Sequence, residues 1–156
     1  FKSSVNQSKT NSAIADGTEK DAVHNISTNL NTEKWINENT KFKTTLYSRK
    51  TVSDYDDSAT NEIGYHIDNR LYVFQTGIER VSKNFKDSLT FHYNKYDREY
   101  ENGGYLDEFD SETLVAKAER KIKSTDKLSF GLGSEYKYDW GAFEDRGSYF
   151  NKLIRK

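Results

Sequence analysis

Hydrophobic and polar residues alternate with period two over residues 114–138, apart from a break at residues 124–126. Successive side chains of a β-strand point to opposite faces, so this pattern predicts one long β-hairpin. With the turn at 124–126, the expected register places Ile122 opposite Leu128 and Arg120 opposite Phe130. One face is then mainly apolar, with Leu114, Ala116, Ala118, Arg120, Ile122, Leu128, Phe130, Leu132, Ser134, Tyr136 and Tyr138. The other face carries charges and glycines, among them Lys117, Glu119, Lys121, Lys123, Gly131, Gly133, Glu135, Lys137 and Asp139.

The same alternation, read along the whole chain, predicts an antiparallel meander of long hairpins. The expected strands are 1–7, 22–31, 40–53, 66–81, 88–99, 113–123 and 127–139, and the tail at 150–156 is the expected start of an eighth. An arm of about ten residues is longer than the usual globular strand and matches a tilted strand that crosses a bilayer. Aromatic residues are expected towards strand ends, as in an interfacial girdle: Tyr72, Phe74, Tyr93, Tyr96, Tyr136, Tyr138 and Trp140.

The expected connections alternate in length and in charge. Short turns at 32–39, 82–87 and 124–126 are flanked by lysines, whereas the long loops at 54–65 and 100–112 are acidic. Long loops at 8–21 and 140–149 complete the pattern. Short turns at one end and long loops at the other are typical of outer-membrane barrels. The sequence therefore predicts an all-β fold, an antiparallel up-and-down transmembrane β-barrel of which this chain supplies about seven or eight strands.

Composition is compatible with this fold but does not decide it. The chain has 156 residues, is 33% hydrophobic and 31% charged, and has a mean hydropathy of −0.99. Aromatic residues make up 14%, which disfavours disorder. A barrel with a wet lumen and an apolar outer band fits these values. A soluble, tyrosine-rich all-β module, sandwich or lectin-like, that binds ligands through acidic and aromatic loops fits them as well.

Several classes of chemistry are disfavoured. The chain has no cysteine, which excludes disulfides and thiol catalysis within it, and no apolar run reaches the length of a transmembrane helix. The net charge of −1 without a basic face argues against nucleic-acid binding. The chain starts at Phe1, without a start methionine or a signal segment, so we expect an internal piece of a longer protein.

Two long segments of the amino-acid sequence resemble the barrel of TonB-dependent outer-membrane receptors, in particular the cobalamin-receptor-like group. The resemblance rests on LTFHYNKYDREYENGGYLDEFDSETLVAKAERK followed by STDKLSFGLGSEYKYDWGAFEDRGSYF. The opening FKSSVNQSKTNSAIADGTEKDAVHNISTNLNTEKWINENTKFKTTLYSRKTVSDYDD resembles an early barrel segment of the same group. These segments share the residue pattern of barrel strands and contain no catalytic signature.

The resemblance implies that residues 1–156 are a partial barrel domain of a receptor with about 22 strands, without its plug domain and remaining strands. It implies a place in the bacterial outer membrane, among lipid and lipopolysaccharide. It also implies uptake of a scarce large ligand, cobalamin or an iron–siderophore complex, energised through the plug by the TonB complex.

No catalytic constellation is apparent, so we do not expect an enzyme. His24, His66 and His92 lie far apart in the sequence, without the spacing of metal ligands. The clustered carboxylates Asp54, Asp56 and Asp57 of a predicted loop are a candidate calcium site, since Ca²⁺ takes six to eight oxygen ligands, although the spacing matches no known loop motif. Aromatic residues of the predicted loops are the candidate ligand contacts, namely Tyr55, Tyr65, Tyr105 and Phe109.

Overall fold

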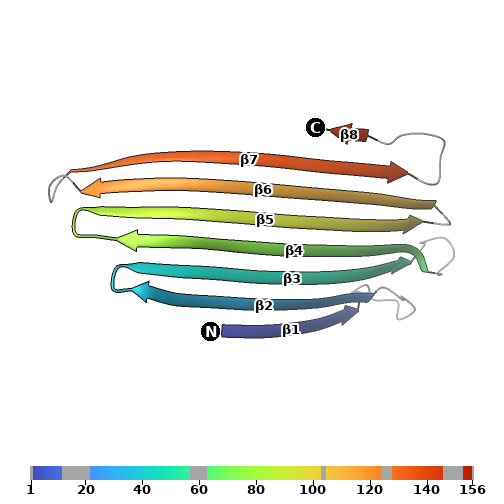
Figure 1. Ribbon diagram of the computed structural model, residues 1–156. Helices are drawn as coiled ribbons and strands as arrows, with labels where there is room; N and C mark the ends of the chain where they lie inside the picture. Colours follow the sequence, from blue (N-terminus) through green and yellow to red (C-terminus); the bar gives the residue numbers. More distant parts are fainter. Residues whose placement is uncertain are drawn as a thin grey trace.

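The computed structural model describes residues 2–11, 22–56, 63–102, 105–123, 128–145 and 153–155. These residues form one antiparallel sheet of eight strands in sequential order (Figure 1). The strands are β1 (Lys2–Asn11), β2 (Ala22–Asn37), β3 (Thr40–Asp56), β4 (Ile63–Val81), β5 (Phe85–Asn102), β6 (Tyr105–Lys123), β7 (Ser129–Asp145) and β8 (Leu153–Arg155). The predicted all-β meander is therefore confirmed, including an eighth strand in the tail.

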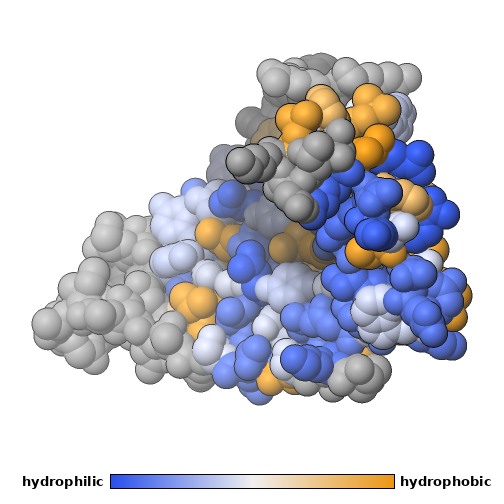
Figure 2. All heavy atoms as spheres, turned by 90° about the vertical axis from the view of Figure 1, so that its left-hand side faces the viewer, coloured by the Kyte–Doolittle hydropathy of each residue, from blue (hydrophilic) through white to orange (hydrophobic). Residues whose placement is uncertain are grey.

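The sheet is a single open layer. Each strand pairs only with its neighbours in sequence, and no pairing among the described residues joins β1 to β7 or β8. These residues contain no buried hydrophobic side chain; only the polar Ser53 and Asp68 are buried. Seen from the end with the short turns, hydrophobic side chains lie at the surface beside hydrophilic ones (Figure 2). The described part of the chain contains no helix that is long and apolar enough to span a membrane.

The strands are longer than predicted. β5 runs to Asn102 and β6 begins at Tyr105, so most of the loop expected at 100–112 is paired strand. β3 likewise runs to Asp56, and β4 begins at Ile63. The loop prediction was wrong because acidity was taken as a loop signal. On an uncovered sheet, charged side chains continue the ladder at little cost, because they stay in contact with solvent.

The β6–β7 hairpin has a different register from the predicted one. Ile122 pairs with Phe130 and not with Leu128, and Arg120 pairs with Leu132. The predicted contact between Arg120 and Phe130 is therefore wrong; the Arg120 guanidinium lies over the ring of Phe85, 5.4 Å from its centroid. A shift of two residues leaves every side chain on its predicted face, because strand alternation has period two.

The register divides the sheet into two faces. Directly opposed residues share a face, so even-numbered positions of β2, β3, β4, β6 and β7 lie with odd-numbered positions of β5. We call this side the apolar face and the other side the polar face. Figure 1 places the β2–β3 and β4–β5 turns at one end, where β6 also ends and β7 begins; this end is here called the short-turn end. The opposite end is the long-loop end.

Candidate functional site

A band without charged residues crosses the apolar face. On β4 it lies between Arg70 and Arg80, and on β5 between Asp87 and Lys95. At a rise of about 3.3 Å per residue, these spans are about 33 and 26 Å along the strands. A strand tilt of about 40° reduces them to about 20–25 Å, close to the apolar band of a membrane barrel. The band comprises Leu30, Thr32, Phe42, Thr44, Leu46, Tyr72, Phe74, Thr76, Ile78, Leu89, Phe91, Tyr93, Leu114, Ala116, Ala118, Ser134, Tyr136 and Tyr138.

Aromatic side chains lie on the border of this band that faces the long-loop end: Tyr72, Tyr93, Tyr138 and Trp140. They were expected near strand ends, but they lie well inside the strands, because the strands continue beyond the band. Tyr96 was assigned to the same girdle and instead lies on the polar face, where its hydroxyl donates to Asn69 Oδ1 at 2.7 Å. Tyrosine and tryptophan at the edge of an apolar layer place a ring in it and a polar group outside it.

At the height of the band, most side chains of the polar face are hydrophilic, with Val73 and Val115 as exceptions. Thr45 donates to Asn31 at 2.7 Å, and Asn31 donates to Asn29 at 2.9 Å. Further along the sheet, Lys117 pairs with Glu135 in the register. Side chains of this kind are satisfied by each other and by water, so this face suits an aqueous lumen.

An aromatic patch lies on the polar face at the long-loop end. The Tyr65 and Tyr100 rings stack with centroids 6.2 Å apart, and Tyr96 and Phe109 meet at 6.1 Å. The Arg98 guanidinium lies over Tyr100, 6.0 Å from its centroid. A hollow of about 430 Å³ is lined by Tyr96, Arg98, Tyr100, Asp107, Phe109 and Phe143. The aromatic patch, defined as these six residues with Tyr65, offers ring faces and one cation to a ligand.

The predicted ligand contacts fall on this same side of the sheet. Tyr55 pairs with Tyr65, Tyr65 pairs with Asn102, and Asn102 pairs with Tyr105. These tyrosines and Phe109 are strand residues, so their assignment to loops was wrong, although all four lie on one face at one end of the sheet.

Sequence reasoning missed five members of the patch as ligand contacts: Tyr96, Arg98, Tyr100, Asp107 and Phe143. Tyr96, Arg98 and Tyr100 alternate with Asp97 and Glu99, which is a period-two signal. Because 100–112 was assigned to a loop, this alternation was not followed to its end.

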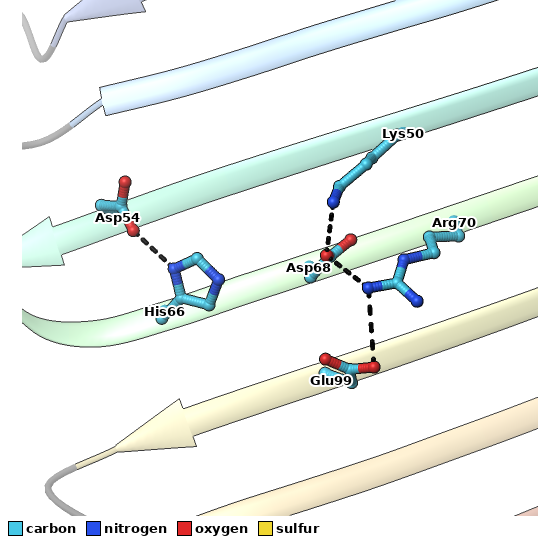
Figure 3. Close-up of polar contacts among 6 residues, drawn as sticks. All are labelled: Lys50, Asp54, His66, Asp68, Arg70 and Glu99. Atoms are coloured by element: carbon cyan, nitrogen blue, oxygen red, sulfur yellow. Dashed lines mark hydrogen bonds and ion pairs between the residues drawn. The ribbon is translucent and has the colours of Figure 1, made fainter.

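Of the three predicted calcium ligands, only Asp54 has a side chain that the structure describes. Asp54 lies on the apolar face, where its Oδ1 is 2.6 Å from His66 Nδ1 (Figure 3). Asp56 ends β3, and Asp57 lies outside the described residues. The described residues contain no group of three or more histidine, aspartate or glutamate side chains that could hold a metal ion. The calcium site stays a prediction.

Beyond the band, the apolar face carries a charged network (Figure 3). Asp68 Oδ2 lies 2.9 Å from Lys50 Nζ and 2.8 Å from Arg70 Nη2, and Glu99 lies 3.7 Å from Arg70. Burial raises the pKa of Asp68, but hydrogen bonds from Arg70 and Lys50 outweigh it, and the pKa lies below its usual value. The nearby Asp110, opposite Asp97, has a raised pKa because of burial and of that second carboxylate.

Comparison with models of known protein families, with curated proteins and with solved structures finds no match to this chain.

Proposed function

We propose that this chain forms part of the wall of a transmembrane β-barrel of the TonB-dependent receptor type in a bacterial outer membrane. In this arrangement the apolar face contacts lipid, and the polar face lines a water-filled lumen. The supporting observation is the change of chemistry between the two faces at one height: Ala116 and Tyr136 lie in the charge-free band, while Lys117 and Glu135 are their neighbours in sequence. Strands of a membrane barrel alternate in this way.

The distribution of charge along the apolar face favours a membrane over a second sheet. A sandwich covers its inner face along the whole length of the strands. Here the half of the face near the long-loop end carries Lys50, Asp68, Arg70 and Glu99, whose burial under a second sheet would be costly. In a barrel the same half extends beyond the lipid into water, where this network is stable.

The aromatic patch gives the proposed lumen a ligand-contact surface at the long-loop mouth. Ring faces together with Arg98 suit a large ligand with a conjugated surface and acidic groups. Cobalamin and iron–siderophore complexes are the ligand classes that we propose, with uptake energised by the TonB complex.

Single-cysteine labelling tests the orientation of the faces, because the chain itself contains no cysteine. The full-length protein, in a cysteine-free background, would carry Ala116→Cys or Leu89→Cys on the apolar face and Gln75→Cys or Thr90→Cys on the polar face. With an environment-sensitive fluorophore on the cysteine, we expect quenching by spin-labelled lipid for the first pair and by aqueous iodide for the second. Equal quenching on both faces, or a protein that stays out of the membrane fraction, would overturn the proposal and favour a soluble module.

Transport is tested by cellular uptake of radiolabelled cyanocobalamin and of a radiolabelled ferric siderophore. We expect uptake of one probe that a protonophore abolishes. Tyr100→Ala and Arg98→Ala each remove a stacking or cation–π contact worth about 1 kcal/mol, which weakens binding several-fold. Tyr72→Ala, a similar truncation on the apolar face, is the matched control and leaves affinity unchanged. Uptake of neither probe contradicts the ligand classes proposed, even if the labelling result stands.

A further inference from the structure

An arginine pair with a shared carboxylate lies at the short-turn border of the apolar face. Arg120 donates from Nε to Asp87 Oδ1 at 2.6 Å and from Nη2 to Oδ2 at 2.9 Å. Arg80 donates from Nη2 to the same Oδ2 at 2.7 Å. Both guanidiniums lie over the ring of Phe85, at 4.9 Å for Arg80 and 5.4 Å for Arg120. The carboxylate and the ring therefore fix the orientation of both cations.

The arginine pair keeps both charge and donors for a further anion. Asp87 supplies one negative charge to two positive ones, which leaves a net charge of +1. A guanidinium has five N–H groups; the bonds to Asp87 use atoms Nε and Nη2 of Arg120 but Nη2 alone of Arg80. Both arginine side chains are half exposed. Forked donors of this kind match the oxygens of a phosphate.

An apolar groove of about 610 Å³ begins at the arginine pair and runs into the charge-free band. It forms because Ala118 lies between Leu89 and Ser134 in the register, so two small side chains follow a large one. Its lining residues on the apolar face, apart from the charged cluster, are Thr40, Ile78, Leu89, Ala118, Leu132 and Ser134. Leu132 is 77% exposed. The groove has an apolar lining that suits a hydrocarbon chain, with cations at one end.

The surrounding short-turn end is also cationic. Residues 79–87 and 119–123 contain six cations (Arg80, Lys83, Lys86, Arg120, Lys121 and Lys123) and three anions (Glu79, Asp87 and Glu119), a balance of +3. Basic residues at a membrane surface favour anionic lipids. Charge complementarity thus selects a negatively charged occupant over a zwitterionic one.

We propose that the Arg80–Asp87–Arg120 cluster and the adjoining apolar groove bind one anionic phospholipid, with its phosphate on the two guanidiniums and an acyl chain along Ile78, Leu89, Ala118 and Leu132. The site rests on the proposed barrel, because it needs the apolar face in lipid. It adds a specific lipid contact at the short-turn end of the barrel.

The test is native mass spectrometry of the full-length protein, released from nanodiscs that contain equal amounts of phosphatidylglycerol and phosphatidylcholine. We expect one retained phosphatidylglycerol, favoured over phosphatidylcholine by about tenfold. The double variant R80Q/R120Q loses this preference. The matched control K83Q/K121Q removes the same amount of charge from the same end, outside the arginine pair. We expect this control to keep the preference for phosphatidylglycerol. Ala118→Leu fills the groove without a change of charge and also abolishes retention. Inorganic phosphate does not compete.

The outcomes separate this site from the proposed function. A protein that inserts and shows heat-modifiable mobility, but retains neither lipid selectively, overturns the lipid site alone. Equal loss in R80Q/R120Q and K83Q/K121Q also overturns it, because the effect is then general surface charge. Competition by inorganic phosphate shows a free-anion site and overturns the acyl-chain contact. A protein that does not insert overturns both proposals.

Discussion

The two faces of the sheet differ in chemistry at the same height along the strands. Around the middle of β6 and β7, Ala116 and Tyr136 lie opposite each other on the apolar face, and one residue further along Lys117 and Glu135 oppose each other on the polar face. Both faces share one backbone ladder and one set of strands. The difference is therefore not one of local strand propensity, which is common to both faces, and the proposed barrel explains it by lipid on one face and water on the other.

A second contrast lies within the apolar face itself. On β4, positions 72–78 of this face carry no charge, while His66, Asp68 and Arg70 follow on the same strand. Strand β4 is thus longer than the part of it that lies in the charge-free band. The border between the two parts is marked by Tyr72, Tyr93, Tyr138 and Trp140, as expected for side chains at the edge of a bilayer.

The difference between the two faces is tested most strongly by placing a charged residue in the middle of the apolar face and, for comparison, at a similar height on the polar face. Ala116→Arg puts a guanidinium in the middle of the charge-free band, and we expect a loss of about 2–4 kcal/mol in the free energy of unfolding. Gln75→Arg, its matched control on the polar face, costs less than about 1 kcal/mol. Urea titration of the full-length protein in lipid vesicles measures both. Equal costs would mean that the two faces contact the same medium.

Removal of the buried carboxylate tests the charged half of the apolar face. Asp68 is 7% exposed and contacts both Lys50 and Arg70, so Asp68→Ala leaves two cations without their partner. We expect a loss of about 2 kcal/mol in the free energy of unfolding. Asp139→Ala, which removes an exposed partner of Lys137 on the polar face, is the control and has a much smaller effect. The reverse order of the two effects would contradict the assigned network.

The same network predicts a pH dependence. The pKa of Asp68 is lowered from 3.8, so the stability it provides is complete above pH 3.8 and is lost as the pH falls through the lower pKa of the folded protein. The stability difference between wild type and Asp68→Ala is therefore constant near neutral pH and shrinks below pH 3.8. Urea titrations in acidic buffers measure it; a difference that persists unchanged at the lowest pH would exclude an ionic contribution.

Glycine substitutions sharpen the description of the polar face. A Cβ at Gly77 would lie 2.9 Å from the carbonyl oxygen of Leu89, whereas at Gly131 it would meet no atom within 4 Å. We expect Gly77→Ala to cost about 1–2 kcal/mol in unfolding free energy and Gly131→Ala to stay within about 0.5 kcal/mol. The same urea titration measures both. A neutral Gly77→Ala would mean that β4 and β5 are further apart at this point.

The alternation of side chains allowed the faces and the meander to be predicted, but not the register or the strand ends. Residues 124–126 carry no glycine to fix a turn type, and a shift of two residues leaves every face unchanged, so nothing in the pattern distinguished Leu128 from Phe130 as the partner of Ile122. The strand ends were missed because acidic residues were assigned to loops, although Asp54 of the expected loop 54–65 lies in β3 with its Oδ1 2.6 Å from His66 Nδ1 on β4. That cross-strand partnership depends on the register.

The candidate site could be predicted only in part, because it too depends on the register of the strands. Tyr65 and Phe109 were selected as aromatic residues of loops, and both belong to the aromatic patch. Arg98 and Tyr100 were not selected, since their value as ligand contacts depends on sharing a face with Tyr96 and Phe109 across β5 and β6. A set of contacts drawn from several strands becomes visible only once the pairing is known.

The smallest expected effect concerns Asp110, because its pKa is raised whereas that of Asp68 is lowered. Burial and the facing Asp97 raise the pKa of Asp110, so its ionised form is disfavoured in the folded protein. The penalty is absent below pH 3.8, grows as the pH rises towards the raised pKa, and is constant above it. We therefore expect Asp110→Asn to match wild type in acid and to exceed its unfolding free energy by about 0.5 kcal/mol at pH 7. Paired urea titrations at the two pH values measure this gain. A loss at pH 7 would mean that Asp110 is stabilised by a cation, and the charged half of the apolar face would then contain no repulsive pair at this position.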